Sequence, residues 1–176
     1  MKDSIIEIKH LRYAWDIVRT KDSSGGIDGK SIKDYGRNIG RNLERLHREL
    51  AGGKWKPMTS VDFNIPKADG GVRTIGLSVV EDKIVQTAIK MVIEPVLERT
   101  FSSSSYAYRP GRGHLRCVRR VMAEISAESN VWFFRADINN VFDSIDRDLL
   151  FRRLRTIICN QWVNNMIDLY QYFVKK

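Results

Sequence analysis

Apolar positions recur along the chain at helical spacing, with one interruption at strand spacing. Residues 4–20 carry apolar side chains three or four positions apart, and so do residues 32–50. Ser31 is a candidate cap for the second of these helices, and Gly52 and Gly53 are expected to end it. The pattern therefore predicts two N-terminal helices separated by a Gly- and Ser-rich loop.

The middle of the chain predicts a hairpin, a helix and a loop. Residues 60–66 and 72–77 favour two strands, joined by a turn whose glycines accept positive φ. Helical spacing returns from about 80 to 97, where Pro95 should perturb or end the last turn. Residues 101–113 are rich in Ser, Tyr, Gly and Arg, which is typical of a loop.

The C-terminal part predicts three further helices and one strand. Residues 114–127 favour a basic helix, and residues 146–158 and 160–173 favour two more. Residues 131–138 form a continuous apolar run with aromatics, typical of a buried strand. The fold class is therefore α+β with few strands. The buried strand would need sheet partners, and nothing after it offers one, which suggests an unfinished sheet.

Charge and composition indicate what kind of partner the chain binds and where it acts. The formal net charge is +9, and the pI of about 9.7 favours a polyanionic partner, although charge alone leaves a merely basic protein open. The apolar fraction of 43% supports a core. Cys117 and Cys159 lie in no CxxC pair and are interpreted as small apolar residues. With no long apolar run and no apolar leader segment, we expect a cytoplasmic protein.

Asp137 is the first candidate for chemistry because it ends the predicted buried strand. A buried carboxylate is costly unless it is paired, hydrated or bound to a cation. Mg²⁺ takes one or two carboxylates and leaves room for phosphate oxygens. Asp143 and Asp146 follow closely, but we favour turn and N-cap roles for them at the start of the next helix.

Two basic segments have both a functional and a structural interpretation. The predicted hairpin would bring Lys67 and Arg73 near each other, where they either clamp a triphosphate or serve as ordinary edge charges. The loop with Tyr106, Arg109 and Arg112 either contacts bases and phosphates or is anchored by buried tyrosines.

Taken together, these segments resemble the reverse transcriptase domain of group II intron-encoded maturases. The resemblance rests on IPKADGGVRTIGL from Ile65, SYAYRPGRG from Ser105 and ADINNVFDSIDRDLL from Ala136, in this order. GGIDGKSIKDY from Gly25 is similar to the extra N-terminal motif of that family, and the helix from Val79 is similar to its helix between the first and second motifs. The likeness covers about residues 20–155.

The resemblance implies the fingers and an incomplete palm of a right-hand polymerase, mostly helical, with a β-hairpin and a buried palm strand. Residues 1–130 would be the fingers region, and residues 131–176 the start of the palm. Asp137 matches the first catalytic aspartate, a ligand of Mg²⁺. Phe142 matches the residue that guards the sugar 2′ position.

The same resemblance implies that Lys67 and Arg73 hold the incoming dNTP. Tyr106, Arg109 and Gly111 match the loop that lies against the template. We expect RNA contacts from the arginines of this loop and of two basic helices, unless those helix faces are simply solvated. These arginines are Arg37, Arg41, Arg45, Arg112, Arg116, Arg119 and Arg120.

The chain departs from the family at two points. Asn139 and Asn140 stand where the family has Lys and Gly, and the family's aromatic-Ala-Asp-Asp turn is absent. Because two-ion phosphoryl chemistry needs several carboxylates, we expect that this chain does not polymerise alone. Whether it is itself an enzyme stays open, although its parent would be an RNA-directed DNA polymerase.

Three interpretations of the function of this chain stay open. The chain is a fragment that binds RNA template and dNTP, or a stand-alone RNA-binding maturase remnant, or a reverse transcriptase of retron, diversity-generating or CRISPR-associated type. A homodimer through the fingers or an exposed palm surface is also expected, since unpaired edges recruit partners.

Overall fold

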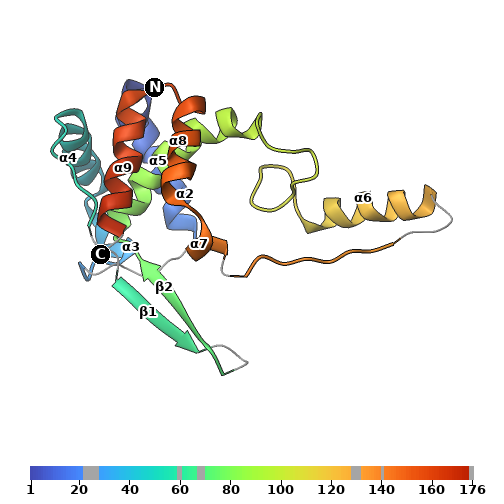
Figure 1. The fold of residues 1–176 in the computed structure, drawn as a ribbon. Coiled ribbons are helices and arrows are strands. Elements are labelled where there is room, and N and C mark those ends of the chain that lie inside the picture. The colour runs from blue at the N-terminus through green and yellow to red at the C-terminus, as the bar shows by residue number, and fades with distance from the viewer. Residues whose placement is uncertain (22–27, 59–60, 67–69, 128–131, 140, 175–176) are drawn as a thin grey trace. The chain divides into compact units, whose positions relative to one another are not determined.

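The fold is α+β and mostly helical, as the sequence predicts (Figure 1). The computed structural model describes residues 1–21, 28–58, 61–66, 70–127, 132–139 and 141–174. Its elements are α1 (Lys2–Ile6), α2 (Ile8–Thr20), α3 (Ile32–Arg37), α4 (Ile39–Ala51), β1 (Val61–Pro66), β2 (Val72–Leu77), α5 (Val80–Glu98), α6 (His114–Ala127), α7 (Val141–Ser144), α8 (Arg147–Ile157) and α9 (Gln161–Val174).

The chain divides into two compact units. The first, unit 1, comprises Met1–Glu94 and Ile158–Lys176, and the second, unit 2, comprises Pro95–Ile157. The boundary predicted at residue 130 divides the expected fingers from the expected palm, which is a functional division and not one by compactness. It therefore stays a prediction.

The predicted helix of residues 32–50 is divided into α3 and α4 at Asn38, whose φ of −124° and ψ of 36° leave the helical region. Ser31 caps α3 as predicted, in a capping box with Asp34. Asn42 joins the two helices again, because its side-chain amide donates to the Tyr35 carbonyl at 2.9 Å.

Gly36 explains how closely α2 and α3 approach. A Cβ at this position would lie 3.1 Å from Cζ2 of Trp15, which is tighter than ordinary van der Waals contact. The Trp15 ring packs against the Tyr35 ring with centroids 5.6 Å apart. Both aromatic side chains are buried in the core of unit 1.

The core of unit 1 is built from one apolar stripe of each helix. Leu43, Leu46 and Leu50 of α4 are buried, as are Ile84 and Val85 of α5. This is the stripe that the sequence spacing predicted for residues 32–50, and its burial supplies the main stabilisation of the unit. Ile158 and α9 complete the core from the far end of the chain.

The predicted hairpin is present as a two-stranded antiparallel ribbon of β1 and β2. Its register pairs Val61 with Leu77 and Pro66 with Val72, so its turn comprises residues 67–71. The ribbon projects from the helices of unit 1 (Figure 1). Phe63 and Ile65 of β1 are exposed, so the hairpin is attached to the unit mainly at its base.

The first turn of α5 carries two acidic side chains, where the helix dipole favours negative charge. Glu81 accepts hydrogen bonds from the Tyr35 hydroxyl at 3.1 Å and from the Arg45 guanidinium. Burial and the neighbouring Glu81 charge raise the pKa of Tyr35. The next side chain, Asp82, is buried, and its Oδ2 accepts from the backbone N–H of Met58 at 3.0 Å.

Helix α5 continues through Pro95 to Glu98, although we expected Pro95 to perturb or end its last turn. A helix-interior proline removes one backbone donor and usually kinks or breaks the helix. Among the described residues, no helix is both long and apolar enough to cross a membrane.

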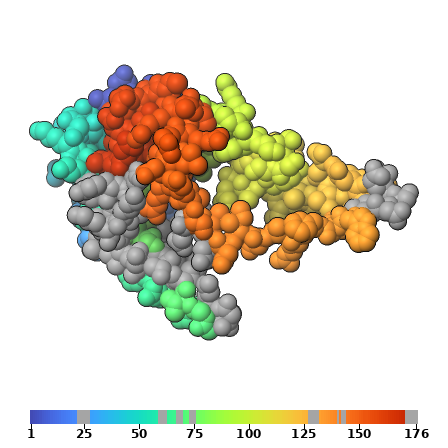
Figure 2. Space-filling view, viewed as in Figure 1, coloured from blue at the N-terminus to red at the C-terminus, as the bar shows by residue number. Residues whose placement is uncertain are grey.

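The prediction of a buried strand at residues 131–138 is wrong for its described part, residues 132–138. They belong to no sheet, and Trp132 is 97% exposed and Phe134 92% exposed. In Figure 2 this segment lies at the surface. An apolar run becomes a buried strand only when other strands pair with it. No described segment pairs with residues 132–138.

The buried carboxyl of Asp82 predicts an unusual dependence of stability on pH. Burial raises its pKa from 3.8 to about 7, the hydrogen bond from Met58 opposes this, and the charges of Glu81 and Asp28 add to it. Between these two values the folded state keeps a proton that the unfolded state has released. Stability is therefore highest below the unfolded value and falls as pH rises through about 7.

We predict that Asp82→Asn removes this dependence. In urea denaturation, wild type and variant should be similar at pH 5. At pH 8 the variant should be more stable by about 3 kcal/mol, because an amide needs no ionisation in the core. Parallel stability curves for the two proteins from pH 5 to pH 8 would contradict this account.

Candidate nucleic-acid and nucleotide site

The tip of the hairpin is the predicted nucleotide-holding element. Lys67 lies outside the described residues. The backbone of Arg73 pairs with that of Ile65, two positions before Lys67 in the sequence. The roles of both side chains stay predictions.

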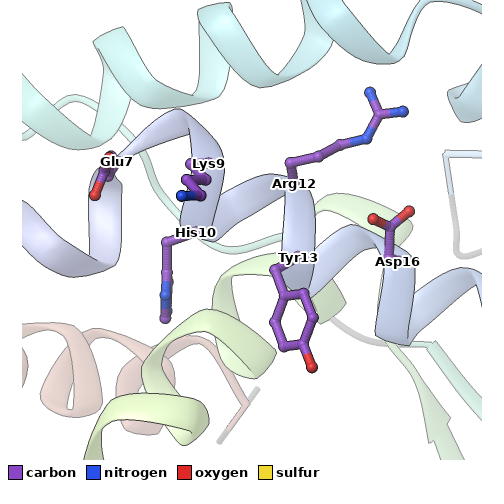
Figure 3. A pocket seen from close by; sticks show the side chains of 6 residues that line it. All are labelled: Glu7, Lys9, His10, Arg12, Tyr13 and Asp16. Carbon is purple, nitrogen blue, oxygen red and sulfur yellow. The ribbon is translucent and has the colours of Figure 1, made fainter.

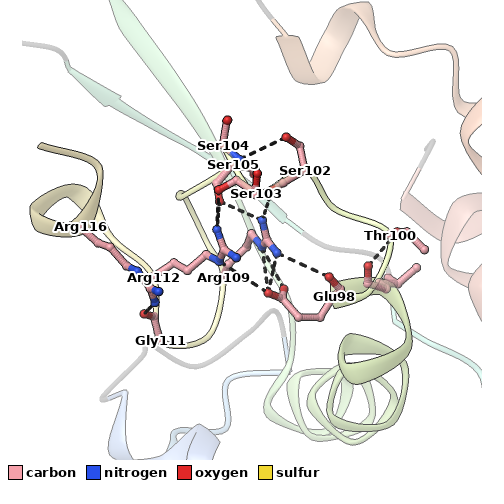
Figure 4. A network of polar contacts seen from close by, with 11 residues as sticks. Glu98, Thr100, Ser102, Ser103, Ser104, Ser105, Arg109, Gly111, Arg112 and Arg116 are labelled. Atoms are coloured by element: carbon pink, nitrogen blue, oxygen red, sulfur yellow. Dashed lines mark hydrogen bonds and ion pairs between the residues drawn. The ribbon is translucent and has the colours of Figure 1, made fainter. Parts of the chain in front are cut away.

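The loop between α5 and α6 is organised by Arg109 (Figure 4). Its side chain is 5% exposed, and its Nη2 lies 2.6 Å from Oε1 of Glu98. The same guanidinium donates to the carbonyls of Ser102 and Ser105 at 2.5 and 2.9 Å. It also lies over the Phe101 ring, 5.3 Å from the centroid. Arg109 thus ties together three points of the loop.

The pKa values of the pair agree with this geometry. The hydrogen bond from Arg109 is the main cause that lowers the pKa of Glu98, and the hydrogen bond to Glu98 raises the pKa of Arg109. Both groups are thus held in their charged forms. Because the fork of Arg109 already has partners within the loop, its described task is structural, and the template contact expected for it stays a prediction.

Tyr106 and Arg112 form a second layer of the loop. The Arg112 guanidinium donates to the Ser103 carbonyl at 2.7 Å and lies 5.8 Å from the centroid of the Tyr106 ring. Tyr106 is half-buried and lines a hollow with Cys117 and Val121 of α6 and with Phe133. The loop is thereby braced against α6, which is closer to the anchoring interpretation of its tyrosine than to free exposure.

Tyr108 is the aromatic side chain that the loop presents to solvent. It is 98% exposed, and its φ of 57° is unusual for a residue other than glycine. Gly111, with φ of 65°, adopts the same region without a steric cost. From the sequence, the two tyrosines of this loop were expected either to stack on bases or to anchor the loop by burial, and burial is wrong for Tyr108.

Arginines gather where the loop leads into α6. A surface hollow at this point is lined by Arg112, Arg116 and Arg119 together with His114 and the flanking glycines. Arg116 donates to the Gly111 carbonyl at 3.3 Å, while Arg120 pairs with Glu124 one turn further along α6. The cluster leaves several guanidinium donors open to solvent, as a phosphate-binding surface requires.

Some arginines of the predicted basic face of residues 33–48 have carboxylate partners, and others do not. Arg45 is engaged by Glu81 and Glu49, and Arg37 pairs with Asp34 at 2.9 Å. Arg41 is exposed and has no ion pair within the described part of the chain. Of Arg37, Arg41 and Arg45, Arg41 is therefore the one without a carboxylate partner in the described part of the chain.

Asp137 lies in the extended segment 132–139 and is exposed. Among the described residues, no three His, Cys, Asp or Glu side chains are grouped as a metal site. Asp146 accepts from the Leu149 N–H at 3.0 Å and so caps α8, as predicted. Phe142 and Asp143 lie in α7, and their side chains are outside the described ones, so the sugar-guarding role of Phe142 stays a prediction.

A further hollow lies along α2 (Figure 3). It is lined by both signs of charge, with Lys9 and Arg12 beside Glu7 and Asp16. His10 also lines the hollow, and its Nε2 donates to the Ala88 carbonyl at 2.9 Å, since a carbonyl can only accept. The balanced charges do not favour a polyanion.

Sequence reasoning missed one cationic element, α8. It carries the run FRRLR from Phe151, and Arg147, Arg152 and Arg153 are exposed. The arginine run itself indicates a basic helix, but this part of the sequence was interpreted only through the capping roles of Asp143 and Asp146.

Comparison with known proteins identifies relatives of this chain. Residues 65–176 match the family described as reverse transcriptase (RNA-dependent DNA polymerase). Protein YkfC of Escherichia coli is 29% identical over 133 residues, which are 74% of this chain and 35% of that protein. The COX1/OXI3 intron 1 protein of Saccharomyces cerevisiae is 31% identical over 121 residues, 68% of this chain and 14% of that protein. The group II intron-encoded protein LtrA of Lactococcus lactis is 24% identical over 126 residues, 71% of this chain and 21% of that protein.

The Arg109 network generates a prediction about the loop. In Arg109→Lys, an ammonium point charge cannot reach Glu98 and the two serine carbonyls together. Amide hydrogen exchange across residues 102–112 should become roughly tenfold faster, the effect of losing one or two charge-assisted hydrogen bonds. Arg120→Lys is the matched control, because its ion pair is exposed, and it should leave the loop unchanged. Equal exchange in both variants would show that Arg109 does not organise the loop.

Proposed function

This chain belongs to the reverse transcriptase (RNA-dependent DNA polymerase) family, with intron-encoded reverse transcriptases and maturases among its relatives, and we propose that it supplies the RNA-gripping and nucleotide-holding part of such an enzyme. In this proposal residues 1–130 act as fingers and residues 131–176 begin the palm. The chain spans 35% or less of the length of the relatives named above, so the activity of a whole enzyme is part of the proposal.

The observation that carries the proposal is the family match over residues 65–176. This range contains the end of β1 with all of β2, the arginine-rich loop with α6, and the segment with Asp137, in the order that the motifs require. A hairpin alone or a basic helix alone would have a purely structural explanation. Their occurrence in series within one matched family supports a shared task at a nucleic acid.

RNA binding is proposed for the arginines around the start of α6 and for Arg41 on α4. Those near α6 line one hollow, and their donors suit phosphate oxygens. Exposed Tyr108 offers an aromatic face beside them, on which an unpaired base can stack. The net charge of +9 supports attraction to a polyanion of any sequence.

Nucleotide holding is proposed for Lys67 and Arg73 at the hairpin. Arginine recognises phosphate through its fork and lysine as a point charge, so the pair suits the triphosphate of a dNTP. Phe142 would then guard the sugar 2′ position, as the resemblance implies.

Reverse transcriptases use divalent metal ions, and Asp137 is the residue of this chain proposed to bind Mg²⁺. A two-ion site needs several converging carboxylates, and among the described residues no three His, Cys, Asp or Glu side chains are grouped as such a site. The described donor set therefore does not fit the metal pair by itself. We propose that polymerisation requires further carboxylates, and we derive no step through the metal from this chain.

An RNA-binding role without polymerisation is the alternative, and the same arginines support it. Self-association through the hairpin-bearing part or through the exposed segment 132–138 also stays a prediction.

RNA binding can be tested through its salt dependence. If about five phosphates are neutralised, the logarithm of affinity for a structured RNA should fall with the logarithm of salt concentration at a slope of about −4 to −5. The double variant Arg41→Gln, Arg119→Gln removes two phosphate contacts and should flatten this slope by about 2. Filter binding across a salt series measures both slopes.

The matched control is Arg19→Gln, whose side chain pairs with Asp16 on α2 at 3.0 Å, outside the proposed surface. It should keep the wild-type slope. A wild-type slope near zero would contradict RNA binding, and equal flattening by all three substitutions would show that the charge acts without a defined surface.

A further inference from the structure

Asp82 is an unusual core residue because ionising its buried carboxyl costs free energy. It is 3% exposed, in the first turn of α5, where neighbours such as Val80 and Ile84 are fully buried. A buried carboxylate is destabilising compared with an apolar side chain of similar size unless its hydrogen bonds are needed. The described partner of its side chain is the backbone N–H of Met58, at 3.0 Å.

Met58 lies at the foot of the hairpin. Only two residues separate it from Val61, the first residue of β1, and only two separate Leu77, the last residue of β2, from Val80, the first of α5. Val61 and Leu77 pair with each other. The covalent chain therefore joins β2 to the first turn of α5, and the Asp82 hydrogen bond joins the segment before β1 to the same turn.

Other contacts hold the same point. The Tyr170 hydroxyl of α9 donates to the backbone carbonyl of Asp82 at 3.2 Å, and its ring packs against Trp55 with centroids 5.7 Å apart. Trp55 is itself buried, and its backbone N–H donates to the Glu49 carbonyl near the end of α4. The segment from Trp55 to Met58 is thus fixed at both ends.

Several apolar side chains of the ribbon are exposed to solvent. Phe63, Ile65 and Val72 are 52%, 47% and 62% exposed, so these apolar side chains do not pack on the helices of unit 1. A two-stranded hairpin is marginal in water by itself. Its direction therefore depends on how firmly its two feet are attached.

We propose that Asp82 is a positioning residue, which fixes the β1 foot of the hairpin and thereby sets where the tip with Lys67 and Arg73 stands. The nucleotide-holding consequence rests on the proposed function above, whereas the anchoring of the hairpin does not. Asp82 touches neither substrate nor metal in this role and acts through the backbone of Met58.

Hydrogen exchange followed by mass spectrometry tests the anchoring directly. In Asp82→Ala the acceptor is lost, and amides of residues 61–66 and 72–77 should exchange roughly tenfold faster, while those of α2 and α4 stay within twofold of wild type. Asp82→Asn keeps an acceptor oxygen for Met58 and, at pH 5, where the two proteins should be equally stable, it should restore wild-type exchange in the hairpin. Asp34→Ala is the matched control, because it removes another Asp that accepts a backbone N–H, at the capped end of α3.

The pattern across the chain decides the outcome. Equal acceleration in the hairpin and in α2 and α4 would mean that Asp82 only stabilises the fold, and it would overturn the proposal, as would failure of Asp82→Asn to restore exchange. If Asp82→Ala does not fold, Met58→Pro removes the same hydrogen bond from the donor side and must loosen the hairpin selectively.

A second readout separates this inference from the proposed function. Photo-crosslinking of an azido-dATP to the chain, in the presence of RNA and Mg²⁺, should label the hairpin of the wild type, and Asp82→Ala should reduce the labelling severalfold. Absence of labelling in the wild type would contradict nucleotide holding, while selective loosening measured by exchange would still establish the anchor.

Discussion

The first turn of α5 is the junction on which unit 1 depends. Glu81 binds the Tyr35 hydroxyl and the Arg45 guanidinium, and so connects α5 to α3 and α4. Asp82 binds the backbone of Met58 and, through its own carbonyl, the Tyr170 hydroxyl of α9. Two adjacent acidic residues in one helical turn thus join four parts of the chain to α5, three through their carboxylates and α9 through a backbone carbonyl. Their negative charge is favoured at a helix start, which lowers the cost of burying them.

Unit 2 is held by a different kind of interaction. Among the described residues of Pro95–Ile157, Arg109 is the only buried one, and its partners are Glu98 and two serine carbonyls. Apolar side chains of α6, such as Leu115 and Met122, are exposed instead. A polar network fixes the local path of a loop well, because its bonds are directional, but it buries little apolar area. The loop can therefore keep a defined shape in a unit without an apolar core.

The sequence predicted local structure well and long-range pairing poorly. Helical spacing located α2, α5, α6, α8 and α9, and the turn glycines located the hairpin, because these depend on neighbouring residues. Residues 132–138 were expected in a sheet, and that failed because strand pairing depends on segments elsewhere. The site shows the same division. Motif order pointed to the right family, but the charge pattern could not reveal that Arg45 and Arg109 already have carboxylate partners.

We propose that RNA binds the loop and the start of α6 in unit 2, and α4 in unit 1. Ultraviolet crosslinking of the chain to a structured RNA, with the attached peptides identified by mass spectrometry, tests it most directly. The account predicts crosslinks in residues 105–120, with Tyr108 among them, and in residues 33–48. Crosslinks confined to α8, or to the evenly charged face of α2, would contradict it.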